Sequence, residues 1–62
     1  MQIKKEKAIT LGYQAAINGM DRIPLNDDNL SIIKQGLNQE DRIKLHYAWV
    51  KGYDVAKREY SL

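Results

Sequence analysis

Six basic residues near the two ends of the chain are the side chains best suited to binding another molecule. They are Lys4, Lys5, Lys7, Lys44, Lys51 and Arg58. The last three are spaced by seven residues, and a helix presents such residues on one face because seven residues make almost two turns. These residues can follow a nucleic-acid backbone, since each phosphate that they neutralise releases counterions. The alternative is an ordinary solvated helix surface, which would carry similar charges.

The net charge is small, but its distribution along the chain permits a basic face. The chain carries +2 overall, but residues 1–22 carry +2, residues 23–41 carry −3 and residues 42–62 carry +3. Tyr47 and Tyr53 lie among the cations of the last segment, and an exposed tyrosine ring can stack on unpaired bases. Asp54 and Glu59 reduce the positive charge of the same segment.

Groups that could perform catalysis are scarce. The chain has no cysteine, and its one histidine is His46. Nucleophilic catalysis needs a nucleophile, a base and a group that orients the base. No carboxylate lies three or four residues from His46, where a helix would bring it alongside. We interpret His46 as a packed or edge histidine, and we predict no enzymatic activity, no cofactor and no small-molecule substrate.

A metal site is not predicted either. Asp27, Asn29 and Ser31 have the spacing that opens a calcium-binding loop, but position 6 would be Ile32 in place of glycine and position 12 would be Asn38 in place of glutamate. Helix capping accounts for these residues better. The absence of cysteine excludes zinc sites built on sulfur.

The elements that must position these residues are three helices in a single domain, residues 1–62. Apolar residues at helical spacing and the stop at Asn18-Gly19 predict a first helix over about residues 3–18. Residues 19–27 form a loop in which Pro24 marks a turn. A second helix over about 28–35 has several possible caps at its start and ends at Gly36. A third helix, capped by Asn38, covers about 39–59.

An internal repeat predicts how the two long helices pack. Ala8-Ile9-x-x-Gly12-Tyr13-x-x-Ala16 recurs forty residues later as Ala48-Trp49-x-x-Gly52-Tyr53-x-x-Ala56. The small residues form a flat strip on each helix, and the predicted helix-packing residues are Ala8, Gly12, Ala16, Ala48, Gly52 and Ala56. A glycine inside a helix costs about 1 kcal/mol relative to alanine, so the matched pair indicates a compensating close crossing over Gly12 and Gly52.

The third helix also carries a wide apolar arc. One stripe consists of Leu45, Trp49, Tyr53, Ala56 and Tyr60, and it is widened to about half the circumference by Ile43, Tyr47 and Val50. Two helices of the same chain can cover such an arc, and so can one helix together with a second subunit. A homodimer is therefore an alternative, because a chain of this length hides only about 60% of its unfolded surface.

A helix-turn-helix is disfavoured by charge. The second and third helices have a suitable spacing, but the recognition helix would begin with Gln39-Glu40-Asp41. Recognition helices present their first residues to base edges beside phosphates, which repel two carboxylates.

The repeat and the proline turn resemble the ribosome modulation factor family, very small bacterial proteins with relatives in phages and mobile elements. The first family motif is similar to residues 12–19, which run Gly12-Tyr13-Gln14-Ala15-Ala16-Ile17-Asn18-Gly19. Ile23-Pro24-Leu25 keeps only the proline of the Cys-Pro-Tyr turn, and Trp49-x-x-Gly52-Tyr53-x-x-Ala56 is similar to the last motif, about fifteen residues later than in the family. The resemblance implies a helical hairpin that binds ribosomal RNA or the small ribosomal subunit. A protein-interaction module with an unrelated role, as on a phage or mobile element, is the alternative.

Targeting segments are not evident. No apolar stretch of signal-peptide length follows the charged start, and the longest apolar run, residues 47–50, is far short of the roughly 20 residues that span a bilayer. We therefore expect a cytoplasmic protein that does not enter a membrane.

Overall fold

The computed structural model of the protein describes residues 2–61, which form three α-helices and one short 3₁₀ turn. The elements are α1 (Gln2–Ile17), η1 (Pro24–Asn26), α2 (Asp28–Lys34) and α3 (Gln39–Tyr60). The predicted all-α fold is therefore confirmed. The helix bounds differ from the expected ones by a single residue, and the segment expected to be a loop contains η1, which begins at the proline because its fixed φ suits a first helical position.

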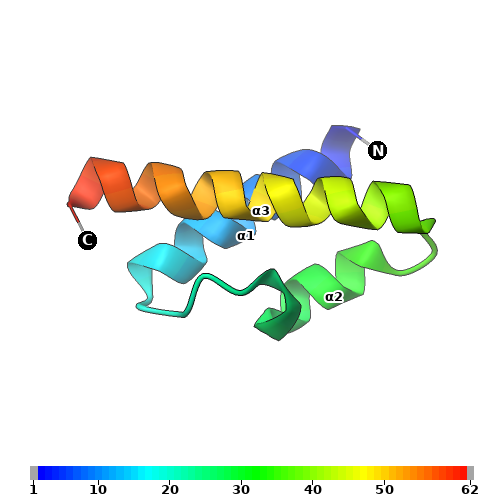
Figure 1. Ribbon diagram of the computed structural model, residues 1–62, viewed down its shortest axis with the longest axis horizontal. Coiled ribbons are helices and arrows are strands. Elements are labelled where there is room, and N and C mark those ends of the chain that lie inside the picture. Colours follow the sequence, from blue (N-terminus) through cyan, green and yellow to red (C-terminus); the bar gives the residue numbers. More distant parts are fainter. Residues whose placement is uncertain (1, 62) are drawn as a thin grey trace.

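The chain reverses direction twice (Figure 1). As a result, α1 and α3 run in the same direction, and α2, which lies between them in the sequence, runs in the opposite direction. Gly19 and Gly36 follow α1 and α2 with φ of +76° and +81°, the left-handed conformation that glycine adopts without steric cost. The α3 helix begins at Asn38, whose side chain accepts a 2.8 Å hydrogen bond from the Asp41 amide.

The two long helices touch backbone to backbone at their glycines. A Cβ added to Gly12 would lie 2.7 Å from the carbonyl carbon of Trp49, and one added to Gly52 would lie 2.8 Å from that of Ile9. Neither position has room for a methyl group, so the predicted close crossing is confirmed. The two contacts are reciprocal, since Ile9 and Trp49 occupy the same position in the two copies of the sequence repeat.

The reciprocity extends to the tyrosines that follow the two glycines. The Tyr13 hydroxyl lies 3.2 Å from the Tyr60 hydroxyl, within hydrogen-bond distance, and the Tyr53 hydroxyl donates to the Met20 carbonyl at 2.5 Å. Met20 and Tyr60 are again forty residues apart. The sequence repeat therefore corresponds to an approximate two-fold relation between α1 and α3, which accounts for its occurrence on both helices.

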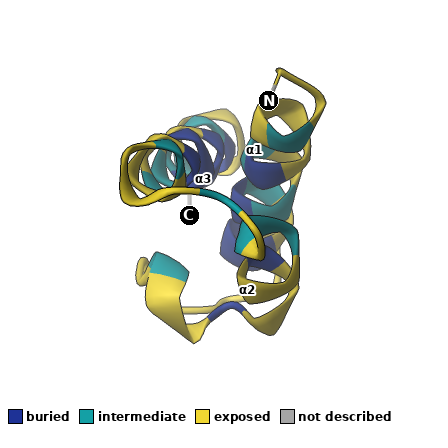
Figure 2. Cartoon of the chain, turned by 90° about the vertical axis from the view of Figure 1, so that its right-hand side faces the viewer, coloured by how far each residue is buried: buried dark blue, intermediate teal, exposed yellow. Residues whose placement is uncertain are grey.

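The core lies between the facing sides of α1 and α3, where Figure 2 shows most of the buried residues. All six predicted packing residues are buried: Ala8, Gly12, Ala16, Ala48, Gly52 and Ala56. The largest fully buried side chains are Trp49, Leu30 and Leu45. Because the helix strips are lined by small residues, the crossing is tight and the bulky side chains gather beside it.

The short α2 helix is attached to the long pair by apolar side chains and by hydrogen bonds. Leu30 is completely buried, while Ile33 and Leu37 are half-buried against the core. Asp27, one of the candidate caps, is the cap that forms: its Oδ1 accepts from the Asn29 amide at 2.9 Å and the Leu30 amide at 3.3 Å. Its Oδ2 accepts from Trp49 Nε1 at 2.8 Å, so one buried carboxylate joins α2 to α3.

The apolar arc of α3 is covered only in part. Leu45, Trp49, Tyr53 and Ala56 are buried within the chain, whereas Ile43, Tyr47 and Tyr60 remain exposed. The chain therefore covers one side of the arc itself. None of the helices in residues 2–61 combines the length and the hydropathy needed to cross a membrane.

Candidate nucleic-acid interface

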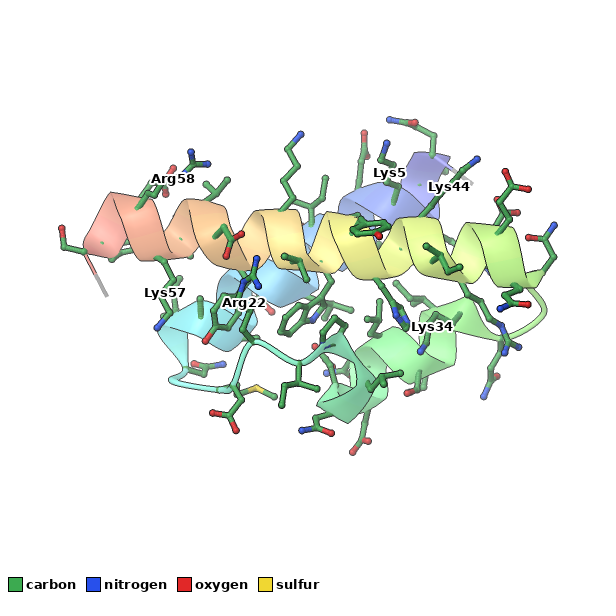
Figure 3. The ribbon with its side chains drawn as sticks, in the orientation of Figure 1. Lys5, Arg22, Lys34, Lys44, Lys57 and Arg58 are labelled. Atoms are coloured by element: carbon green, nitrogen blue, oxygen red, sulfur yellow. The ribbon has the colours of Figure 1, made fainter. Side chains whose placement is uncertain are left out.

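Four of the six candidate cations lie along one edge of the molecule. Lys5 of α1 lines a shallow depression together with Lys44, Tyr47 and Lys51 of α3. An adjoining depression shares Tyr47 and Lys51 and continues past Asp54 and Lys57 to Arg58. Figure 3 shows Lys5, Lys44 and Arg58 on this edge of the molecule. We call Lys5, Lys44, Lys51 and Arg58 the basic edge, which extends about 21 Å along α3 at 1.5 Å per residue.

The position of Lys5 depends on the direction of the helices. Because α1 and α3 run the same way, the start of α1 lies near the first half of α3 and not near its end (Figure 1). An antiparallel pair would place Lys5 beside the last turns of α3. The periodicity of the sequence predicts which residues share a face of one helix, but it holds no signal for this direction.

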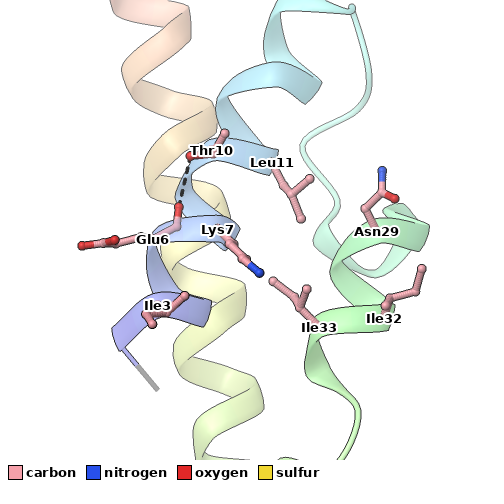
Figure 4. Close-up of a pocket in the computed structure, with 8 residues that line it drawn as sticks. All are labelled: Ile3, Glu6, Lys7, Thr10, Leu11, Asn29, Ile32 and Ile33. Atoms are coloured by element: carbon pink, nitrogen blue, oxygen red, sulfur yellow. Dashed lines mark hydrogen bonds between the residues drawn. The ribbon is translucent and has the colours of Figure 1, made fainter.

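The other two candidate lysines lie elsewhere. Lys7 lies two residues from Lys5, about 200° around the helix, and lines the groove between α1 and α2 (Figure 4). Lys4 is half-buried one turn before the buried Ala8. The three lysines at the start of the chain therefore point in different directions, and only Lys5 joins the basic edge.

The acidic residues of the carboxyl-terminal segment are occupied by partners within the chain. Asp54 forms a bidentate pair with Arg22, with Nε–Oδ1 and Nη2–Oδ2 distances of 2.8 Å. The hydrogen bonds from Arg22 hold the pKa of Asp54 below its usual range, so the carboxylate stays charged while Arg22 balances it. Glu59 accepts a 2.5 Å hydrogen bond from the Tyr13 hydroxyl. That bond raises the pKa of Tyr13 and keeps its proton in place.

Three cations outside the basic edge are likewise engaged, although Lys57 also lines the second depression. Figure 3 shows Arg22, Lys34 and Lys57 away from the basic edge. Arg22 pairs with Asp54, Lys34 Nζ lies 2.9 Å from His46 Nε2, and Lys57 Nζ lies 5.4 Å from the centre of the Tyr53 ring. Among residues 2–61 the basic edge has one ion pair, the exposed 3.7 Å contact between Lys44 and Glu40, and such contacts are worth little. Its charges are therefore available to a ligand.

The two tyrosines considered for base stacking differ sharply in exposure. Tyr53 is 5% exposed, stacks on Trp49 with ring centres 5.3 Å apart, and donates its hydroxyl to the Met20 carbonyl. Tyr47 is 72% exposed and lies within the basic edge. Of these two tyrosines, Tyr47 is the one that can offer a ring face to a ligand.

His46 is a half-buried histidine that accepts a hydrogen bond from Lys34. Burial, followed by the charge of Lys34, lowers the pKa of His46, so the neutral imidazole is favoured. Within residues 2–61 no three His, Asp or Glu side chains gather in a way that could hold a metal ion. The position of His46 agrees with a structural role in attaching α2 to α3.

We expect the protein to lose stability as the pH falls below about 6.5. The folded state holds His46 with a lowered pKa, while the unfolded chain has the ordinary value near 6.5. The unfolded state therefore binds more protons in acid, and the stabilisation is fully present above pH 6.5 and is lost as the pH falls toward the lowered value. Thermal unfolding between pH 7.5 and 5.5 measures the effect. The variant His46→Gln should show a flat profile, and an equal slope in both proteins would assign the effect to another group.

Comparison with protein-family models, curated proteins and solved structures found no match to this chain. The resemblance to the ribosome modulation factor family therefore rests on the motifs given above.

Proposed function

We propose that this chain is a small non-enzymatic RNA-binding protein whose basic edge contacts the phosphate backbone. The observation that carries the proposal is the convergence of Lys5 from α1 with Lys44 and Lys51 from α3 in one depression. Neutralised phosphates release their counterions, so cations without strong internal partners favour binding to a polyanion. Phosphate contacts position the protein without reading sequence.

The target that we propose is ribosomal RNA in the small subunit. This part of the proposal comes from the resemblance to ribosome modulation factor, and it is supported by the use of both glycine motifs at the helix crossing. The tests are co-sedimentation of the tagged protein with ribosomes from a bacterial lysate, at low and at moderate salt. Salt-sensitive recovery with small subunits or dimeric ribosomes supports the target. Recovery only at the top of the gradient would exclude it.

Replacing Lys44 and Lys51 together by glutamine should flatten the salt dependence of RNA binding. Each lost phosphate contact reduces the slope of log K against log salt by about 0.7 for a single strand. The double variant should therefore lose about 1.4 from the slope, measured by titrating labelled RNA at several salt concentrations. Lys7→Gln is the control, since it removes one lysine charge from the groove between α1 and α2, away from the basic edge, and it should leave the slope unchanged. An unchanged slope in the double variant would count against the basic edge.

A second candidate function is a homodimer formed through the groove between α1 and α2. Ile3 and Ile32 are 70% and 62% exposed on its two sides, and Leu11 and Ile33 line its floor (Figure 4). Glu6 and Lys7 at the same groove carry opposite charges, so a second copy related by a two-fold axis could pair them reciprocally. This groove lies on a different helix face from the exposed part of the α3 arc. Sedimentation velocity at micromolar concentration tests this homodimer by measuring the oligomeric state. A protein that is strictly monomeric would exclude it.

A further inference from the structure

We infer that the basic edge binds single-stranded RNA, with Tyr47 as the platform on which an unpaired base stacks. The inference rests on the proposed RNA-binding function and adds the conformation of the RNA. It begins from the unusual state of Tyr47, whose ring is 72% exposed in the middle of a 22-residue helix. Among residues 2–61 its hydroxyl has no hydrogen-bond partner, whereas the hydroxyl of Tyr13 donates to Glu59 and that of Tyr53 donates to the Met20 carbonyl. The Tyr47 ring therefore adds little to the packing of the core.

Cations surround Tyr47 on the same face. Lys44 lies three residues before it and Lys51 four residues after it, which are the spacings that bring side chains together on a helix surface. Lys5 reaches the same depression from α1. A base stacked on the ring has a phosphate on each side along its strand, so lysines on either side of the ring match the repeating unit of a nucleic-acid chain.

The aromatic ring favours unpaired over paired RNA. In an A-form duplex the base faces are stacked inside the helix, and proteins recognise it mainly by its shape, its phosphates and its 2′-hydroxyls. A projecting tyrosine then finds no base face to cover. In a single strand every base offers a face, so stacking adds affinity without demanding a particular sequence.

The experiment compares one labelled RNA in two forms, as a single strand of mixed sequence and annealed to its complement, by fluorescence anisotropy at fixed salt. The wild-type protein should bind the single strand more tightly. Tyr47→Ala should weaken single-strand binding by about tenfold or more, which lies within the range measured for loss of one stacked base. It should leave duplex binding and the salt slope unchanged. Tyr47→Phe is the matched control, since it keeps the ring and should bind as the wild type does.

The outcomes separate this inference from the proposed function. Equal affinity for both RNA forms, or Tyr47→Ala binding as tightly as wild type, would overturn the stacking role and leave the phosphate contacts standing. Failure of the wild type to bind either form at low salt would overturn the proposed function itself. Circular dichroism of each variant confirms that the fold is intact, as expected for a side chain that is mostly in solvent.

Discussion

Replacing Gly12 by alanine should destabilise the protein by several kcal/mol. The new methyl group would lie 2.7 Å from the Trp49 carbonyl carbon, and its neighbour is backbone, which cannot rotate away. Overpacking of this kind costs about 1–3 kcal/mol or more. In a domain of this size a loss of 2 kcal/mol lowers the melting temperature by about 10 °C, which thermal unfolding followed by circular dichroism will measure.

Helix propensity predicts the opposite sign, which makes the result decisive. Alanine is favoured over glycine in a helix by about 1 kcal/mol, so an uncrowded position would become more stable on substitution. Gln14→Ala, at an exposed position of the same helix, is the control and should be close to neutral. Gly52→Ala should repeat the loss, because its methyl group would meet Ile9 in the same way. A stabilised Gly12→Ala protein would mean that α1 and α3 do not cross at the glycines.

Replacing Asp27 by alanine should be the second large loss, of about 2–4 kcal/mol. The substitution removes the cap of α2, which is worth about 0.5–2 kcal/mol. It also leaves the buried Trp49 indole N–H without its acceptor, at a cost of about 1–3 kcal/mol. Urea unfolding monitored by Trp49 fluorescence will measure the loss and report the change around the indole.

Asp27→Asn separates the two roles of the carboxylate. An amide oxygen can still accept from the Asn29 and Leu30 amides, but the amide nitrogen would then face the indole N–H, so the cap survives and the tryptophan bond is lost. We expect this variant to be intermediate between wild type and Asp27→Ala. A variant as stable as wild type would mean that the bond to Trp49 contributes nothing to the attachment of α2.

The rigidity of the crossing matters for the proposed interface. Lys5 comes from one helix and Lys44 and Lys51 from the other, so their separation is held by the contacts at Gly12 and Gly52. A packing defect at either glycine should therefore disturb the arrangement of the cations as well as the stability. RNA binding should therefore be measured with variants of the exposed residues Lys44, Lys51 and Tyr47, because these substitutions leave the helix crossing unchanged.

Much of the fold could be predicted from the sequence because its causes are local. Glycine adopts the left-handed conformation at Gly19 and Gly36, and Asn38 caps the helix that follows it. These features depend on residues within one or two turns of each other. The close crossing could also be predicted, since two glycines inside helices carry a cost that only tight packing offsets.

The arrangement of the candidate site could not be predicted from the sequence, because it depends on contacts between residues far apart in the chain. The pairs Asp27–Trp49, Arg22–Asp54 and Lys34–His46 join residues that are 12 to 32 positions apart. The way the helices cross decides that Asp27 caps α2 and that the charge of Asp54 is balanced by Arg22.

The sequence determined where α1 and α3 meet, and the tertiary structure decided their relative direction. The repeat determined that α1 and α3 meet at Gly12 and Gly52, because small residues on each strip allow close approach in either direction. The tertiary structure decided that the two helices run the same way, which brings Lys5 to Lys44 and turns Lys7 toward α2. Helical periodicity is a property of one helix and is the same whichever way its neighbour runs, so only the folded chain could show which cations share an edge.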